Sequence, residues 1–120
     1  MTRFIPLICT LMLGIAPLAH AHHSGAAFDP DIKVAVDGTV NHVEWTSPHA
    51  RLYVDSKDGE GNVVTWDFEL PSPVTLMRRG WSKSSLPIGA NVHVEGIRAR
   101  EYPTIAVAKK VLNDGKSLFE

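Results

Sequence analysis

The first stretch of this sequence constrains the fold most, because it decides how much of the chain is left to form a domain. It begins with one basic residue, continues through an apolar run from Phe4 to Leu18 and closes on Ala19-His20-Ala21. A basic start, an apolar middle and a small-x-small end are the three parts of a cleavable secretory signal. We therefore expect cleavage after Ala21, export to the periplasm and a mature chain of residues 22–120.

The rest of the chain shows no signal for membrane anchoring. The apolar run is shorter than the roughly 20 residues that span a bilayer, and no later stretch is as long and apolar. Cys9 is the only cysteine; it follows the bulky Ile8 and precedes most of the run, which argues against lipidation. We expect no stable membrane insertion after cleavage, and a mature domain of about 100 residues that folds around one core without disulfides.

The charge of the chain argues against one class of partner. It carries 12 Lys and Arg against 13 Asp and Glu, and the signal contains one of the basic residues and none of the acidic ones. Nucleic-acid binding requires clustered positive charge, which a slightly acidic exported domain lacks. The partners that remain are a metal ion or another periplasmic protein.

Hydrophobic patterning divides the mature chain into an extended lead, residues 22–32, with Phe28 as its apolar anchor, and a single domain, residues 33–120. Alternation of apolar and polar residues is typical of half-buried strands. It predicts strands over residues 33–45, 50–55, 64–70, 91–95 and 104–112.

The first of these strands contains a change of phase. Val34 and Val36 share one face, whereas Val43 and Trp45 share a face of opposite parity. Because side chains alternate strictly along a strand, this offset predicts a bulge within residues 38–42. A long first strand that bends midway is suited to a small closed barrel.

A short helix is predicted between the third and fourth strands. Ser72 and Pro73 form its cap and first turn, Gly80 ends it, and Trp81 is expected to fold back over Leu76. Three strands, a helix and two strands is the order of a five-stranded OB-like Greek-key barrel. A small open β-sandwich or a partly closed meander is the alternative.

The residues behind the signal carry the main functional hypothesis. Cleavage makes His22 the N-terminus, and a free α-amine with the ring of the same residue can chelate copper(II), which favours nitrogen ligands. His49, presented by the turn at Ser47-Pro48, would complete the site, with His23 and Asp29 as further ligands. Copper is therefore the expected cofactor.

Simpler interpretations of these histidines stay open. His22 and His23 can be an idle polar terminus, and His49 can hold a turn by donating to a backbone carbonyl. His42 and His93 are predicted to face outward and are weaker candidates. Zinc has less support, because no tight His/Cys spacing is present.

Three tryptophans are a second conspicuous feature. Aromatic side chains on an OB-like face can form a ligand platform. Trp45 and Trp66 fall on apolar strand faces, however, and Trp81 follows the predicted helix. Their positions favour packing in a small core.

Asp67 and Glu69 are predicted to lie side by side on a solvated strand face, where Arg51, Arg78 or Arg79 could pair with them. Paired carboxylates act in hydrolases only across a cleft. The sequence has no nucleophile elbow and no phosphate-binding glycine loop. The residues therefore favour a non-enzymatic role.

Several short segments of the sequence are together typical of one family. They are His22-His23-Ser24, Gly38-Thr39-Val40, Glu44-Trp45-Thr46-Ser47-Pro48-His49, Trp66, Ser72-Pro73, Gly80-Trp81-Ser82, Ser85-Leu86 and Asp114-Gly115. In these segments the sequence resembles DUF6152, a family of small exported bacterial proteins with no assigned function. Ser47 stands where asparagine is expected, and Leu70-Pro71-Ser72 replaces a glycine-rich helix entry. The resemblance implies a periplasmic, barrel-like domain and no particular activity.

The leading hypothesis is thus a non-enzymatic periplasmic copper-binding protein. An OB-like interaction module that binds a protein or small ligand without metal is the first alternative. A small copper-dependent redox enzyme is the second.

Overall fold

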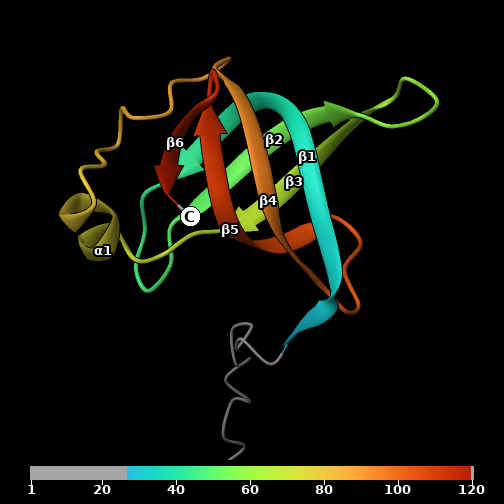
Figure 1. Ribbon diagram of the computed structural model, residues 1–120, viewed down its shortest axis with the longest axis horizontal. Coiled ribbons are helices and arrows are strands. Elements are labelled where there is room, and N and C mark those ends of the chain that lie inside the picture. Colours follow the sequence, from blue (N-terminus) through green and yellow to red (C-terminus); the bar gives the residue numbers. More distant parts are fainter. Residues whose placement is uncertain (1–26, 120) are drawn as a thin grey trace, which may run out of the picture.

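The computed structural model describes residues 27–119, so the predicted signal and its cleavage site lie outside the described part. The elements follow one another along the chain as in Figure 1: β1 (Phe28–Glu44), β2 (Arg51–Lys57), β3 (Val63–Glu69), α1 (Pro73–Arg78), β4 (Asn91–Ala99), β5 (Ile105–Asn113) and β6 (Lys116–Phe119). The domain is mostly β, with one short helix between β3 and β4, as the sequence predicts. Within these residues no helix has the length and apolar character needed to cross a membrane.

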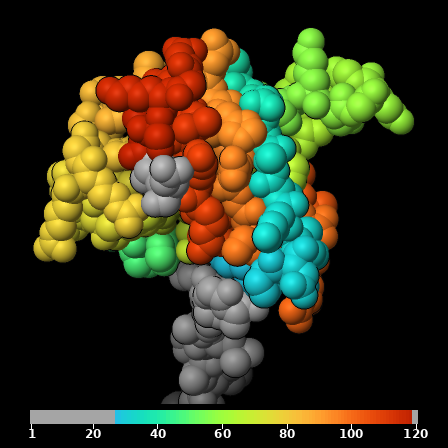
Figure 2. Space-filling view, viewed as in Figure 1, coloured from blue at the N-terminus to red at the C-terminus, as the bar shows by residue number. Residues whose placement is uncertain are grey.

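The strands form one sheet in the order β3-β2-β1-β4-β5-β6. All neighbours in that order are antiparallel, and β3 additionally pairs in parallel with β5, from Asp67 opposite Ile105 to Glu69 opposite Val107. Backbone pairing therefore runs in a ring through β1, β2, β3, β5 and β4. Figure 1 shows the strands curving around a common interior, and Figures 1 and 2 show the β2–β3 hairpin projecting from the body.

The sixth strand was not among the predicted ones. Asp114 has a φ of 47° and Gly115 a φ of 77°, a tight reversal that returns the chain onto β5. Ser117 then lies opposite Leu112. The turn itself is visible in the sequence, but the segment after it is too short for alternation to indicate a strand.

β1 bends where its pattern changes phase. Its register with β2 shifts between Val40 and His42, which confirms the predicted bulge. The strand begins at Phe28 instead of Lys33, so part of the predicted lead belongs to β1. Phe28 is buried and lies opposite Ala99, and this pairing with β4 extends the strand through a stretch whose sequence shows no alternation.

β4 is longer than predicted, because it continues through Gly96 to Ala99. A Cβ atom at position 96 would overlap the carbonyl oxygen of Val107 on β5. Glycine therefore permits close approach of the two strands at the point where β5 bulges at Lys109. The sequence gives no alternation across this glycine, and tertiary pairing decides the boundary.

The core lies inside the ring and confirms the predicted facing of the strands. Its largest fully buried side chains are Phe68, Leu52, Leu70, Leu76, Val40, Val54, Val94 and Val111. Trp81 belongs to this core, and Trp45 and Trp66 pack against it. The packing interpretation of the three tryptophans is confirmed.

The helix is held as its sequence predicts. Ser72 Oγ accepts a hydrogen bond from the backbone N–H of Thr75, Pro73 occupies the first turn, and Gly80 has a φ of 87°. The N–H of Trp81 donates to the carbonyl of Leu76, and its indole Nε1 donates to the carbonyl of Leu118 at 3.3 Å. Trp81 thereby ties the end of α1 to β6.

Candidate functional site

A hollow of about 320 Å³ opens where β3 and β5 cease to pair. The last pair of this seam is Glu69 with Val107. Beyond it β3 ends and the chain turns toward α1, while β5 bulges at Lys109. The lining residues are His49, Glu69, Leu70, Pro71, Arg79, Val107, Ala108 and Lys109.

His49 occupies one wall of this hollow, after the cis peptide between Ser47 and Pro48. Its side chain is about half exposed, and its Nδ1 lies 3.2 Å from the carbonyl oxygen of Leu70. A carbonyl oxygen can only accept a hydrogen bond, so Nδ1 carries the hydrogen. In the neutral ring, Nε2 is then left with a free lone pair.

Glu69 faces that lone pair. Its side chain is only 9% exposed, and Oε1 lies 3.6 Å from Nε2 of His49. Within residues 27–119 no hydrogen bond reaches its carboxylate; Arg51 Nη1 lies 4.0 Å from Oε2. A buried carboxylate is unfavourable unless hydrogen-bond donors or a cation compensate its charge. Lone pairs on both atoms, across this distance, can be directed at one cation between them.

Arg51 is directed mainly at Asp67 and not at Glu69. Its Nε and Nη2 each donate to a carboxylate oxygen of Asp67 at 2.8 Å, a two-pronged contact. This hydrogen bonding raises the pKa of Arg51, although partial burial opposes the rise. The predicted pairing of Arg51 with these carboxylates is confirmed. Arg51 forms hydrogen bonds with Asp67, whereas its contact with Glu69 is a longer ion pair of 4.0 Å.

The prediction that Glu69 lies on a solvated face is wrong. A second hollow, of about 290 Å³, is lined by Phe28, Pro30, Glu69, Ile97, Val107 and Lys109. The start of β1 therefore borders the same hollow as Glu69 on the outer face of the β3–β5 seam. The sequence offers one signal for this, the apolar Phe28 in an otherwise polar segment, but not where that side chain docks.

The other predicted ligands divide into two groups. His22 and His23 lie outside the described residues. Asp29 accepts a hydrogen bond from Arg100 Nε at 3.3 Å and another from the N–H of Asp31. No hydrogen bond or ion pair joins Asp29 to His49 in the described part of the chain.

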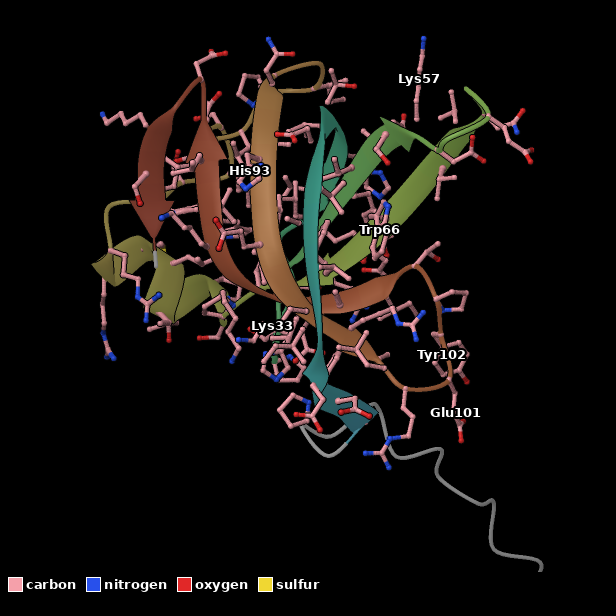
Figure 3. The ribbon with its side chains drawn as sticks, turned by 45° about the vertical axis from the view of Figure 1, so that its right-hand side comes forward. Lys33, Lys57, Trp66, His93, Glu101 and Tyr102 are labelled. Carbon is pink, nitrogen blue, oxygen red and sulfur yellow. The ribbon has the colours of Figure 1, made fainter. Side chains whose placement is uncertain are left out.

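The two histidines predicted to face outward do so without forming a metal cluster. The ring of His42 stacks on Tyr53 with centroids 4.1 Å apart. His93 lies on β4 beside β1 (Figure 3), with Nδ1 2.7 Å from an oxygen of Asp37. Over residues 27–119, no group of three or more His, Cys, Asp or Glu side chains is arranged to hold a metal ion.

A family model matches residues 11–107, which is most of the sequence. The chain belongs to DUF6152. This is described only as a family of unknown function. Searches of the curated proteins and of the solved structures returned no match. Membership confirms the resemblance seen in the sequence, and a role for the DUF6152 protein must be argued from its own side chains.

Proposed function

We propose that this DUF6152 protein is an exported, periplasmic, non-enzymatic metal-binding protein, with copper as its metal. The ligands are the α-amine and ring of His22, the Nε2 of His49 and the carboxylate of Glu69, with His23 and Asp29 as possible additions. One observation carries the proposal. Glu69 is a largely buried carboxylate whose Oε1 faces Nε2 of His49 at 3.6 Å.

The separation of these two atoms suits a shared ion. Metal bonds to imidazole nitrogen and carboxylate oxygen are about 2.0–2.2 Å long. Atoms 3.6 Å apart can both reach one ion, with an angle at the metal of about 120° for bonds of that length. A histidine ligand usually donates its second ring nitrogen to a carbonyl or carboxylate, as His49 does to Leu70.

The remaining ligands have to come from elsewhere, because two groups do not complete a site. His22 precedes Phe28 by six positions, so an extended chain between them spans up to about 20 Å. Phe28 borders one of the two hollows that Glu69 also borders. That length of chain is enough for the predicted mature N-terminus to reach the His49–Glu69 pair from Phe28, which supports it as the second half of the proposed site.

The finer fold assignment is also a proposal. We infer that the ring of strands is an OB-like Greek-key barrel, with β6 added outside it. Three features support this: the helix between β3 and β4, the parallel pairing of β3 with β5, and the sharing of β1 between β2 and β4. In such a barrel the turn that carries His49 lies at one end, where loops hold ligands.

The decisive experiment is a copper(II) titration of mature protein that begins at His22, beside the same protein with one extra alanine before His22. We expect one-to-one binding, release of protons on binding, and at least tenfold weaker binding by the extended form, which lacks the amine next to the ring.

Three variants locate the rest of the site. His49→Ala and Glu69→Gln should each weaken copper binding at least tenfold, whereas the control His93→Ala, which removes a ring already hydrogen-bonded to Asp37, should not. Equal affinity for the first two variants and the native protein would exclude this site. Oxidative turnover with a reductant and oxygen would indicate the enzyme alternative instead.

A further inference from the structure

The short helix α1 has an outward face that takes no part in the core. Pro73 and Leu76 form its buried side. Val74 and Met77 point away from the core, with 50% and 54% of their surface exposed, and Arg78 is exposed as well. Because residues three and four apart share one face of a helix, Val74 lies beside both Met77 and Arg78. This face therefore combines two exposed apolar side chains with a cation.

The segment that carries this face has positive charges and no negative ones. Residues 70–94 contain no Asp or Glu, but they contain Arg78, Arg79 and Lys83, all exposed. The rest of the predicted mature chain carries eight basic residues against 13 acidic ones. The domain is therefore acidic outside this segment and basic within it.

Two of these cations are available to an anion outside the protein. Among the described residues no ion pair includes Arg78 or Lys83. Lys83 lies two residues after Trp81, whose backbone N–H donates to the carbonyl of Leu76. This hydrogen bond holds the turn that carries Lys83 at the C-terminal end of α1. The charges of Arg78 and Lys83 are thus both placed at the same end of the helix.

The place of α1 in the molecule leaves this face accessible. Figures 1 and 2 show α1 and the loop after it on one side of the ring of strands, away from the projecting β2–β3 hairpin. In both views α1 forms the outer edge of the body on that side. A flat surface can therefore approach α1 without meeting the hairpin.

The small size of this face favours a membrane over a protein as its partner. A stable protein–protein interface takes about 20–30 residues from each side, whereas α1 has 6 residues. A lipid surface requires no matching shape. Apolar side chains enter the boundary between head groups and acyl chains, and Lys and Arg are attracted to anionic head groups. The face of α1 supplies both kinds of side chain, and its segment has no carboxylate that anionic lipids would repel.

We propose that α1 and the turn after it dock the protein on the surface of an anionic phospholipid bilayer. Val74 and Met77 enter the interface, and Arg78 and Lys83 contact the phosphate groups. Docking is peripheral and reversible, because two apolar side chains bury little surface. It is independent of the proposed metal site, since none of these four residues is a proposed ligand.

The test is co-sedimentation of metal-free mature protein with vesicles of phosphatidylcholine and phosphatidylglycerol in equal parts, beside vesicles of phosphatidylcholine alone. At low ionic strength the protein should bind the anionic vesicles at least about tenfold more tightly than the neutral ones. About 0.5 M salt should release most of it, because salt screens exposed charges. Equal binding to both kinds of vesicle, or binding to neither, would overturn the proposal.

Two double variants assign the binding to α1. The variant Arg78→Gln with Lys83→Gln should bind anionic vesicles roughly 25-fold more weakly, since each lost charge weakens adsorption about fivefold. The variant Val74→Thr with Met77→Gln should bind about fivefold more weakly, because less apolar surface is buried. Both should unfold at the native urea concentration, since only exposed side chains change. Native affinity in the first variant would contradict the assignment.

The β2–β3 hairpin supplies a matched control. Lys57 and Val63 lie opposite each other there, and both are exposed. The variant Lys57→Gln with Val63→Thr removes one cation and one apolar side chain far from α1, and it should bind anionic vesicles as the native protein does. A loss as large as that in the α1 variants would mean that no particular face docks, and would overturn the proposal.

Discussion

Two histidine–carboxylate pairs in this molecule have opposite arrangements. In the pair of His93 with Asp37 the carboxylate is 84% exposed, and the two groups meet at 2.7 Å. In the pair of His49 with Glu69 the carboxylate is 9% exposed, and the two groups stand 3.6 Å apart. The first pair forms a hydrogen bond at an exposed carboxylate. In the second pair the two atoms lie beyond hydrogen-bond distance, and the carboxylate is buried.

The difference lies in what each pair can take up. The hydrogen bond from His93 to Asp37, with a smaller contribution from Glu95, raises the pKa of His93 above its usual 6.5. That pair therefore responds to protons. His49 uses its Nδ1 on a backbone carbonyl, and its Nε2 faces Glu69 across a space that suits a metal ion. A shared composition of histidine and carboxylate thus gives a hydrogen bond that raises the pKa of a histidine in one place and a candidate metal site in the other.

The largest expected effect comes from removing Arg51. This change tests whether charges near the buried Glu69 matter more for stability than an exposed ion pair does. Arg51→Met leaves Asp67 and Glu69 without their cation, and we expect the free energy of unfolding to fall by about 2 kcal/mol, because a partly buried pair is broken. Urea denaturation measures this. The control Arg100→Met removes an exposed cation from Asp29 and should cost about 0.5 kcal/mol. Equal losses would mean that the Glu69 region is no more sensitive to charge than the surface.

The next effect compares the two carboxylates directly, in the absence of metal. Glu69→Gln should raise the free energy of unfolding by up to about 1 kcal/mol, because it removes a buried charge that Arg51, directed mainly at Asp67, compensates only weakly. Asp37→Asn should lower it slightly at pH 5.5. Added copper(II) should then stabilise the native protein more than Glu69→Gln, through binding to the folded state. If metal-free Glu69→Gln is the less stable protein, the carboxylate is already satisfied within the fold.

The smallest effect is the pH dependence of the exposed pair. Because the pKa of His93 is higher in the folded state than in the unfolded one, its pairing stabilises the fold below about pH 6.5 and is lost as the pH rises through the folded pKa. The stability difference between native protein and Asp37→Asn should be a few tenths of a kcal/mol at pH 5.5, since the pair is exposed. It should vanish at pH 8.5. Urea denaturation at the two pH values measures it, and a difference that grows with pH would contradict the assignment.

Local pattern predicted much of this fold. The order of strands and helix, the bulge before His42 and the Ser72 cap follow from alternation and turn chemistry, which act between near neighbours. The packing of Trp45 and Trp66 follows from the same alternation, and that of Trp81 from the end of the helix. His49 is also placed in a turn by its proline.

Features that depend on distant segments were not predictable in this way. Glu69 has the parity of a solvated residue, yet it is buried and borders a hollow that Phe28, from the distant start of β1, also borders. Arg98 has the parity of the core at the end of a strand that alternation alone ended too early. Both residues owe their surroundings to segments far away in the sequence, which no local period can encode.

The short pairing between β3 and β5 determines where the ring of strands should open most easily. It consists of three residue pairs, fewer than any other pairing in the ring, and Asp67 N–H adds one further bond to the carbonyl of Thr104. A seam this short should separate before the rest of the ring unfolds, and its amide protons should exchange with solvent sooner than those between β1 and β4. Such an opening would bring Glu69 into water. A bound ion could then enter or leave by local breathing, at a rate set by the seam and not by global unfolding.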